Sequence, residues 1–179
     1  MGAETAPSDP FEALGLEARF DLTLGEIERA YLSRAAAAHP DASDEGDAAR
    51  RMASLNEARS TLRDRESRAR ALLVRLGLGV PDDRSLPDGF LESMLETRME
   101  IEGAISGGDP TERESWVRWA EARRTEHASR IQTLFGSLDE SDAAAIGAEI
   151  RVELNAWRYI ERLIEQLDPG YDPEKADFA

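Results

Sequence analysis

The chain of 179 residues contains no cysteine, which excludes disulfide bonds, thiolate metal sites and cysteine nucleophiles. It has only two histidines, His39 and His127, and their wide separation in the sequence argues against a histidine metal site. Basic residues are scarce too. The net charge of −15 disfavours a nucleic-acid partner, because a phosphate backbone attracts lysine and arginine. We therefore expect a protein without a metal site, a cofactor or bound nucleic acid.

Long apolar runs are also missing, and no stretch approaches the length of a membrane span. The first ten residues include Glu4 and Asp9 but no basic residue and no apolar segment, unlike a secretory signal or a transit peptide. We therefore expect a cytoplasmic protein with no membrane partner. The strong net charge suits a protein that meets other proteins.

Helical periodicity is what the chain has in abundance. Hydrophobic residues make up 41% of the sequence, enough to fill a core, and no run of alternating β-branched residues indicates a strand. Capping motifs at Asp9, Thr23 and Asp109 mark helix starts. The apolar stripe of the second helix is Leu24, Ile27, Tyr31, Ala35 and Ala38. The pattern predicts an all-α fold with helices over residues 9–14, 24–38, 48–62, 69–76, 87–105, 110–138 and 142–167.

The composition changes over residues 77–86 (GLGVPDDRSL), where glycine, proline and charged residues gather. This segment is the best boundary between two domains. We expect a disordered N-terminus over residues 1–8, a first helical domain over 9–77, a linker over 78–86, a three-helix domain over 87–167 and a loose tail over 168–179.

The tripeptide His39-Pro40-Asp41 lies between the second and third predicted helices. Pro40 has no backbone N–H and biases His39 away from helix, so the helix ends here in a short, stiff loop. As a catalytic dyad, His39 and Asp41 lack a partner, because nothing nearby indicates an activated nucleophile or an oxyanion hole. We therefore expect no enzymatic activity. The tripeptide alone also suits an ordinary helix end, whose dipole favours His39 and whose turn favours proline and aspartate.

The order of features around this loop resembles a J-domain, the module that activates ATP-driven chaperones of the DnaK and HscA type. A short helix begins at Asp9, a helix carrying Tyr31 leads into the His-Pro-Asp loop, and Asn56-Glu57-Ala58 lies on the helix after it. The resemblance implies that the loop docks on the chaperone and triggers ATP hydrolysis there.

J-domains usually carry lysine and arginine on the helix before the loop, facing an acidic patch of the chaperone. In this chain Ala35-Ala36-Ala37-Ala38 replaces much of that stretch. The residues that the resemblance implies for chaperone binding are His39, Pro40, Asp41, Arg29 and Arg34.

From about residue 9 to residue 167 the chain resembles the HscB family, the J-type co-chaperones of iron–sulfur cluster biogenesis. The resemblance is carried by residues 55–64 (LNEARSTLRD), 68–69 (RA) and 72–73 (LL), 90–91 (FL) and 95–98 (LETR), and 157–163 (WRYIERL). It implies a J-domain followed by a C-terminal three-helix bundle in an L-like arrangement. It also implies two partners: an HscA/DnaK-type chaperone, and an IscU-type scaffold protein that the C-terminal domain binds and delivers.

The predicted helix over residues 87–105 carries two apolar stripes. Phe90, Met94, Ile101 and Ile105 share one narrow arc, while Leu91, Leu95 and Met99 form a second stripe more than a quarter-turn away. The last helix likewise has one face with Ile146, Ile150, Trp157 and Ile164 and another with Val152, Ala156, Tyr159 and Leu163. Either each helix is wedged between two others, with both stripes buried, or the second stripe is an exposed protein-binding patch with an acidic rim.

In the HscB family the client site lies on these helices. The client-binding residues carried over by position are Leu91, Glu92, Leu95, Glu96, Met99 and Tyr159. Two alternatives stay open: a J-domain protein with another client, and a structural or regulatory interaction protein on the same fold that does not stimulate a chaperone. His127 and the tryptophans Trp116 and Trp119 are interpreted as packing residues rather than as parts of a site.

Overall fold

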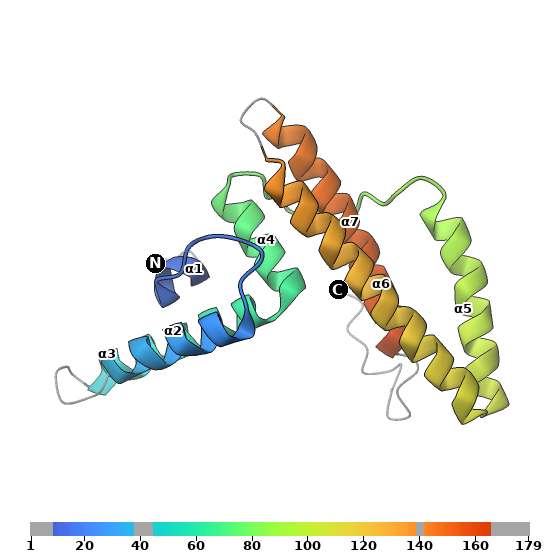
Figure 1. The fold of residues 1–179 in the computed structure, drawn as a ribbon, viewed down its shortest axis with the longest axis horizontal. Coiled ribbons are helices and arrows are strands. Elements are labelled where there is room, and N and C mark those ends of the chain that lie inside the picture. Colours follow the sequence, from blue (N-terminus) through green and yellow to red (C-terminus); the bar gives the residue numbers. More distant parts are fainter. Residues whose placement is uncertain (1–8, 38–44, 139–141, 166–179) are drawn as a thin grey trace, which may run out of the picture. The chain divides into compact units, whose positions relative to one another are not determined.

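The computed structural model describes residues 9–37, 45–138 and 142–165, and all regular structure within these ranges is helical (Figure 1). The tripeptide His39-Pro40-Asp41, expected to bind the chaperone, lies outside the described residues. Contacts between residues divide the chain into two compact units, Met1–Val80 and Pro81–Ala179. The helices are α1 (Pro10–Leu14), α2 (Leu24–Ala37), α3 (Glu45–Arg63), α4 (Arg65–Arg75), α5 (Phe90–Gly107), α6 (Pro110–Gly136) and α7 (Ala143–Glu165).

The predicted capping residues begin their helices. The Asp9 carboxylate accepts a hydrogen bond of 2.9 Å from the backbone N–H of Phe11, and Asp109 accepts one of 2.8 Å from the N–H of Thr111. The Glu26 carboxylate accepts from the N–H of Thr23 at 2.8 Å, and the Thr23 hydroxyl accepts in return, which completes a capping box. These side chains satisfy backbone donors that a helix start leaves without partners.

Apolar side chains of α1, α2, α3 and α4 form the core of the N-terminal unit. Together with two side chains of the connection between α1 and α2, the buried residues of this core are Phe11, Leu14, Phe20, Leu22, Ile27, Ala48, Leu55, Ala58, Leu62, Ala69, Leu72 and Leu73. Leu24 belongs to the predicted apolar stripe of α2 but not to the core, since it is 55% exposed. It is the first residue of α2, and the buried side chains next to it in the sequence are Leu22 and Ile27.

Arg68 of α4 is the one charged side chain buried among the described residues of this unit, with 3% of its surface exposed. Its Nε donates to the carbonyl oxygen of Leu62 at 2.7 Å, and its Nη1 donates to those of Phe20 and Leu22, both at 2.8 Å. Burial lowers the pKa of Arg68. The guanidinium therefore ties α4 to the connection between α1 and α2 and to the end of α3.

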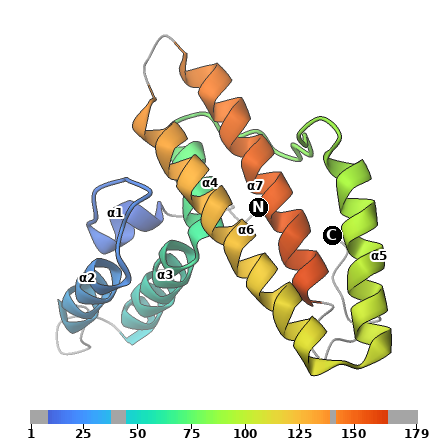
Figure 2. The ribbon, with the colours of Figure 1, turned by 45° about the vertical axis from the view of Figure 1, so that its right-hand side comes forward.

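The C-terminal unit is a bundle of α5, α6 and α7. The long helices α6 and α7 run antiparallel side by side, and α5 packs against both (Figure 2). Ile131 of α6 and Ile150, Leu154 and Ile160 of α7 are buried. A second cluster joins all three helices around Ile101 and Leu163, and it includes Met94, Ile105, Trp116, Tyr159 and Ile164.

Polar contacts link the long helices inside this bundle. His127 Nδ1 lies 2.8 Å from Glu153 Oε2, and Arg130 Nη1 lies 3.1 Å from Glu153 Oε1. Glu153 is 5% exposed, and its hydrogen bond with His127 is the largest cause that lowers its pKa. His127 is thus a mostly buried histidine whose ring is hydrogen-bonded inside the bundle. Farther along, Arg124 holds the Glu161 carboxylate through two hydrogen bonds of 2.5 Å.

Candidate protein-binding surfaces

The helices α2 and α3 flank the segment that contains the His-Pro-Asp tripeptide. The two helices pack against each other, so Ala37 at the end of α2 and Glu45 at the start of α3 bracket this segment (Figure 1). The site residues His39, Pro40 and Asp41 themselves lie outside the described residues. What the structure provides is the geometry of the hairpin that carries them.

Side-chain contacts brace this hairpin on its solvent side. The Tyr31 hydroxyl donates to Asn56 Oδ1 at 2.8 Å, and the Arg59 guanidinium lies 4.7 Å from the centre of the Tyr31 ring. Glu28 of α2 accepts from Arg59 Nε at 3.0 Å and also pairs with Arg63. The hydrogen bond from Arg59 is the largest cause that lowers the pKa of Glu28. These contacts hold the two helices in one register.

Sequence reasoning missed the ion pairs of Glu28, because their partners lie 31 and 35 residues away along the chain. The signal that could have found them is the spacing of Arg59 and Arg63, which places two cations on one face of α3. The acid on the facing helix becomes their neighbour only when the hairpin forms.

The predicted chaperone-binding arginines are both exposed on α2, but they differ in surroundings. Arg29 lies near Glu26 and helps to lower its pKa after the larger effect of the hydrogen bonds from Thr23. The Arg34 guanidinium lies over Gly15, where an added Cβ would overlap it. Gly15 ends α1 with φ 66°, a left-handed conformation. Arg34 therefore covers the end of α1 while staying at the surface.

The second apolar stripe of α5 is exposed. Leu91 is 56% exposed, Leu95 60% and Met99 65%. The first stripe faces the bundle, since Ile101 is fully buried and Met94 packs against the same cluster. For α5 the alternative of two buried stripes is therefore wrong, and three large apolar side chains remain in water.

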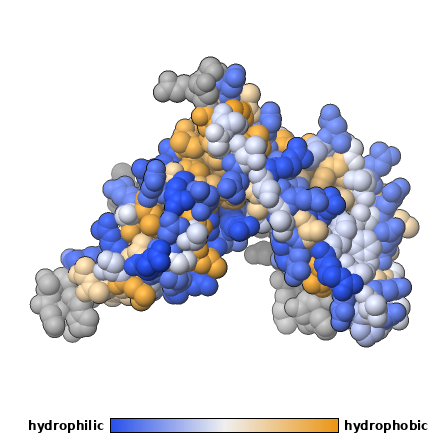
Figure 3. Space-filling view, in the orientation of Figure 1, coloured by the Kyte–Doolittle hydropathy of each residue, from blue (hydrophilic) through white to orange (hydrophobic). Residues whose placement is uncertain are grey.

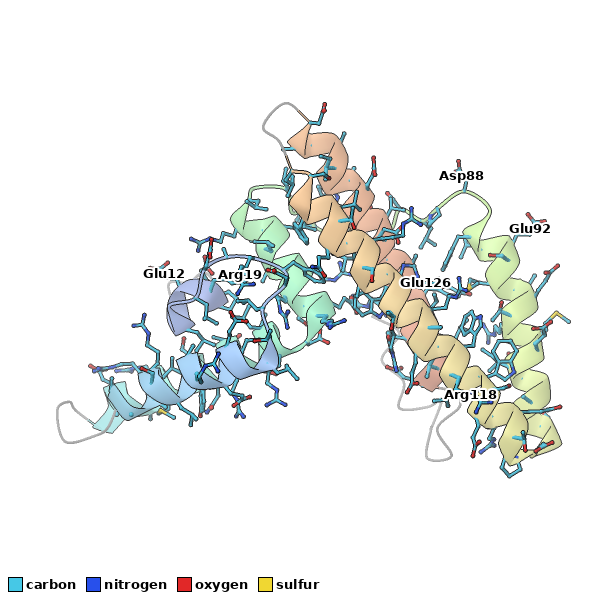
Figure 4. All side chains as sticks on the ribbon, in the orientation of Figure 1. Glu12, Arg19, Asp88, Glu92, Arg118 and Glu126 are labelled. Carbon is cyan, nitrogen blue, oxygen red and sulfur yellow. The ribbon has the colours of Figure 1, made fainter. Side chains whose placement is uncertain are left out.

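Carboxylates accompany this exposed stripe. Glu92 and Glu96 are exposed on α5, and Figure 4 shows Glu92 pointing away from α6 and α7. Arg98 pairs with Glu102 at 2.8 Å one turn later. The outer face of α5 is thus an apolar strip with negative charge along its edge, the combination expected of a protein-binding surface.

The second stripe of α7 differs from that of α5, and for α7 the alternative of an exposed apolar patch is wrong. Ala156 is fully buried and Leu163 is 3% exposed, because α7 contacts both α5 and α6. Tyr159 is half-buried and packs edge-to-face on Phe90, with ring centres 5.5 Å apart. Tyr159 therefore supports the first turn of α5 and reaches the surface only in part.

In the described parts of the chain, no three histidine, aspartate or glutamate side chains converge as metal ligands. None of the described helices combines the length and the apolar character needed to cross a membrane.

Comparison with known proteins shows the family to which the chain is related. Residues 9–71 match the DnaJ domain. The chain is 32% identical over 92% of its length to the co-chaperone protein HscB homolog of Ralstonia nicotianae, of which 98% is covered. It is 31% identical over 90% of its length to the co-chaperone protein HscB homolog of Bordetella petrii, of which 95% is covered.

Solved structures show the same fold. The crystal structure of human co-chaperone protein HscB matches with a TM-score of 0.70 at 19% identity, over 93% of this chain and 82% of that chain. Chaperone HscB from Vibrio cholerae matches with a TM-score of 0.59 at 24% identity, over 88% of this chain and 98% of that chain. The DnaJ match, the full-length relatives and this shared all-helical fold agree, and the chain belongs to the HscB family of J-domain co-chaperones.

Proposed function

We propose that this protein stimulates the ATPase of an HscA/DnaK-type chaperone through His39-Pro40-Asp41 and delivers to it an IscU-type iron–sulfur cluster scaffold. The scaffold would bind the outer face of α5. Membership of the HscB family supports the first role, and the exposed apolar stripe of α5 is the observation that carries the second. Both roles are protein contacts, so the bond-breaking chemistry belongs to the chaperone.

The hairpin supports the chaperone role because it is braced independently of any partner. The contacts of Tyr31 with Asn56 and of Glu28 with Arg59 join α2 to α3 before docking. Helices that are fixed before docking lose less conformational freedom when the protein binds. The two helices that flank His39-Pro40-Asp41 therefore need no rearrangement to meet the chaperone.

The α5 face supports client binding of moderate strength. Fully burying a leucine or methionine side chain contributes about 1.5–3 kcal/mol. Since Leu91, Leu95 and Met99 are each more than half exposed, each has about 1–2 kcal/mol left to contribute before association costs are subtracted. Glu92 and Glu96 would add attraction to a basic rim on the scaffold. Tyr159 would contribute through its exposed edge.

The chaperone role is tested with His39→Gln in a steady-state ATPase assay on the HscA/DnaK-type chaperone of the same organism. We expect wild-type protein to accelerate hydrolysis and His39→Gln to leave it at the basal rate, with unchanged circular dichroism. The matched control is Leu91→Ala/Leu95→Ala, which should stimulate normally when no scaffold is added. Full stimulation by His39→Gln would refute the assignment.

The client role is tested by titrating the scaffold into the Leu91→Ala/Leu95→Ala variant by calorimetry. We expect affinity to fall by about 2–3 kcal/mol, roughly 30- to 150-fold. Val117→Ala removes an exposed apolar side chain of α6 in the same unit and is the matched control, with little expected change. Unchanged affinity in the folded double variant would leave a different client as the better hypothesis.

A further inference from the structure

The first half of α5, which carries Leu91 and Leu95, is held less firmly than the second. Every residue of α5 is described, and its buried side chains, Ile101 and Ala104, both lie in the second half. The helix begins after Gly89 without a side-chain cap. Figure 3 shows hydrophobic and hydrophilic side chains next to one another on the surface that α5 forms. The first turns of α5 therefore depend on other contacts to hold them on the bundle.

The segment that leads into α5 is fastened to α7 by two polar side chains. Arg151 Nε donates to Asp83 Oδ2 at 2.6 Å. Asn155 Nδ2 donates to the carbonyl oxygens of Asp83 and Ser85, at 3.0 and 3.1 Å. We call Arg151 and Asn155 the clip. Figure 2 shows the connection passing α7 before α5 begins, so the clip acts on the chain immediately upstream of that helix.

The ion pair of the clip is sheltered from water. The side chains of Arg151 and Asp83 are 15% and 14% exposed. Hydrogen bonds from Ser85, then that from Arg151, lower the pKa of Asp83 to about 2. The carboxylate therefore stays ionised throughout the physiological pH range, and a sheltered, charge-assisted pair is stronger than an exposed one.

The clip belongs to a row of side chains along one side of α7. Arg151, Asn155 and Tyr159 follow one another at intervals of four residues, which places them about 6 Å apart along the helix axis. Their partners follow in the same order along the chain, namely Asp83, Ser85 and Phe90. The row therefore lays the incoming segment along α7 and sets the place where α5 starts.

We propose that Arg151 and Asn155 are positioning residues of the client-binding face, because by holding residues 83–85 on α7 they keep the first half of α5 where Leu91 and Leu95 lie beside Tyr159. This inference rests on the proposed client-binding function of α5. The clip acts through α5 and not by touching the client. Loosening it lowers the fraction of molecules whose α5 face is ready to bind, and the apparent affinity falls with that fraction.

The first test is hydrogen–deuterium exchange of the full-length Arg151→Met/Asn155→Ala variant. We expect the amides of residues 94–98 to exchange at least about 10-fold faster, while those of α6 and α7 keep their wild-type rates. Arg118→Met, the change from arginine to methionine at an exposed site of α6, is the matched control and should leave α5 unaffected. Arg151→Lys keeps a cation beside Asp83, so we expect it to exchange at an intermediate rate.

The second test measures the association and dissociation rates of the IscU-type scaffold with the same variants. We expect the double clip variant to lower kon about 3- to 10-fold and to leave koff within about twofold, because the bound form keeps every client contact. Leu91→Ala/Leu95→Ala removes such contacts and should act mainly on koff. Asn155→Ala alone, the milder change, should lower kon in the same direction by a smaller factor.

The outcomes separate this inference from the function on which it rests. If Leu91→Ala/Leu95→Ala loses affinity while both clip variants bind like the wild type, the client function stands and the positioning role is refuted. Unchanged exchange in α5, or equal acceleration in α6 and α7, would also refute it. A rise in koff without a fall in kon would make the clip residues client contacts instead. A wild-type protein that binds no scaffold would overturn the client function and this inference with it.

Discussion

Replacing Arg68 with methionine removes a buried guanidinium and leaves an apolar side chain of similar length on α4. The carbonyl oxygens of Phe20, Leu22 and Leu62 would each lose the donor that the structure gives them. All three hydrogen bonds are 2.7–2.8 Å long and charge-assisted. The substitution therefore perturbs the place where α4 meets the end of α3 and the connection between α1 and α2.

The magnitude follows from the number of bonds and from the cost of burying the charge. Hydrogen bonds to a charged group contribute about 1.5–3 kcal/mol each, which sets a gross loss of roughly 5–9 kcal/mol for three. Burial lowers the pKa of Arg68, so the folded protein already bears a desolvation cost that methionine removes. We expect a net loss of about 3–5 kcal/mol, a large share of the stability of a small domain.

The assay is urea unfolding followed by far-ultraviolet circular dichroism. The matched control is Arg65→Met, the same change at an exposed arginine of the same helix, which should cost less than about 0.5 kcal/mol. Arg68→Lys keeps the charge but lacks the planar fork, so we expect an intermediate loss of about 2 kcal/mol. A loss below about 1 kcal/mol for Arg68→Met, or one equal to that of Arg65→Met, would show that the carbonyls find other partners.

Three further predictions concern groups whose surroundings are equally specific. The hydrogen bond with His127 lowers the pKa of Glu153, so its stabilising effect should be present above the ordinary value of 4.5 and lost as pH falls below it; Glu153→Gln should flatten that part of the acid unfolding curve. Hydrogen bonds from Ser85, then that from Arg151, lower the pKa of Asp83 from 3.8 to about 2, so Asp83→Asn should remove stability that the wild type loses only between these pH values, measured by thermal unfolding across the acid range. Gly15→Ala should cost about 1–2 kcal/mol in urea unfolding, because φ is 66° and the new Cβ would displace the Arg34 guanidinium; an unchanged midpoint would contradict it.

Helix positions were largely predictable because their signals are local. Asp9, Thr23 and Asp109 each bond to backbone groups within three residues, so the sequence that surrounds them contains all the needed information. The ends of the helices differ by a few residues from those expected: α3 begins at Glu45 rather than at residue 48, and α4 at Arg65 rather than at residue 69. Polar first turns have no apolar periodicity to reveal them.

Exposure of the apolar stripes was not predictable in the same way. The helices α5 and α7 both carry two stripes, yet α5 leaves Leu91 and Leu95 in water while α7 buries Ala156 and Leu163. The difference lies in the extent of packing, since α7 packs extensively against α6 and also contacts α5, whereas α5 packs far less closely on either helix. Likewise, Leu24 belongs to the periodic stripe of α2 but lies outside the core.

The sequence by itself determined the helices, the His-Pro-Asp tripeptide between two of them, and the resemblance to the HscB family. These depend on backbone hydrogen bonding within a few residues and on the order of motifs along the chain. Only the tertiary structure decided which leucines remain exposed, how Glu28 braces the hairpin and what the Arg68 guanidinium binds. Those outcomes depend on contacts between residues tens of positions apart, which no local pattern encodes.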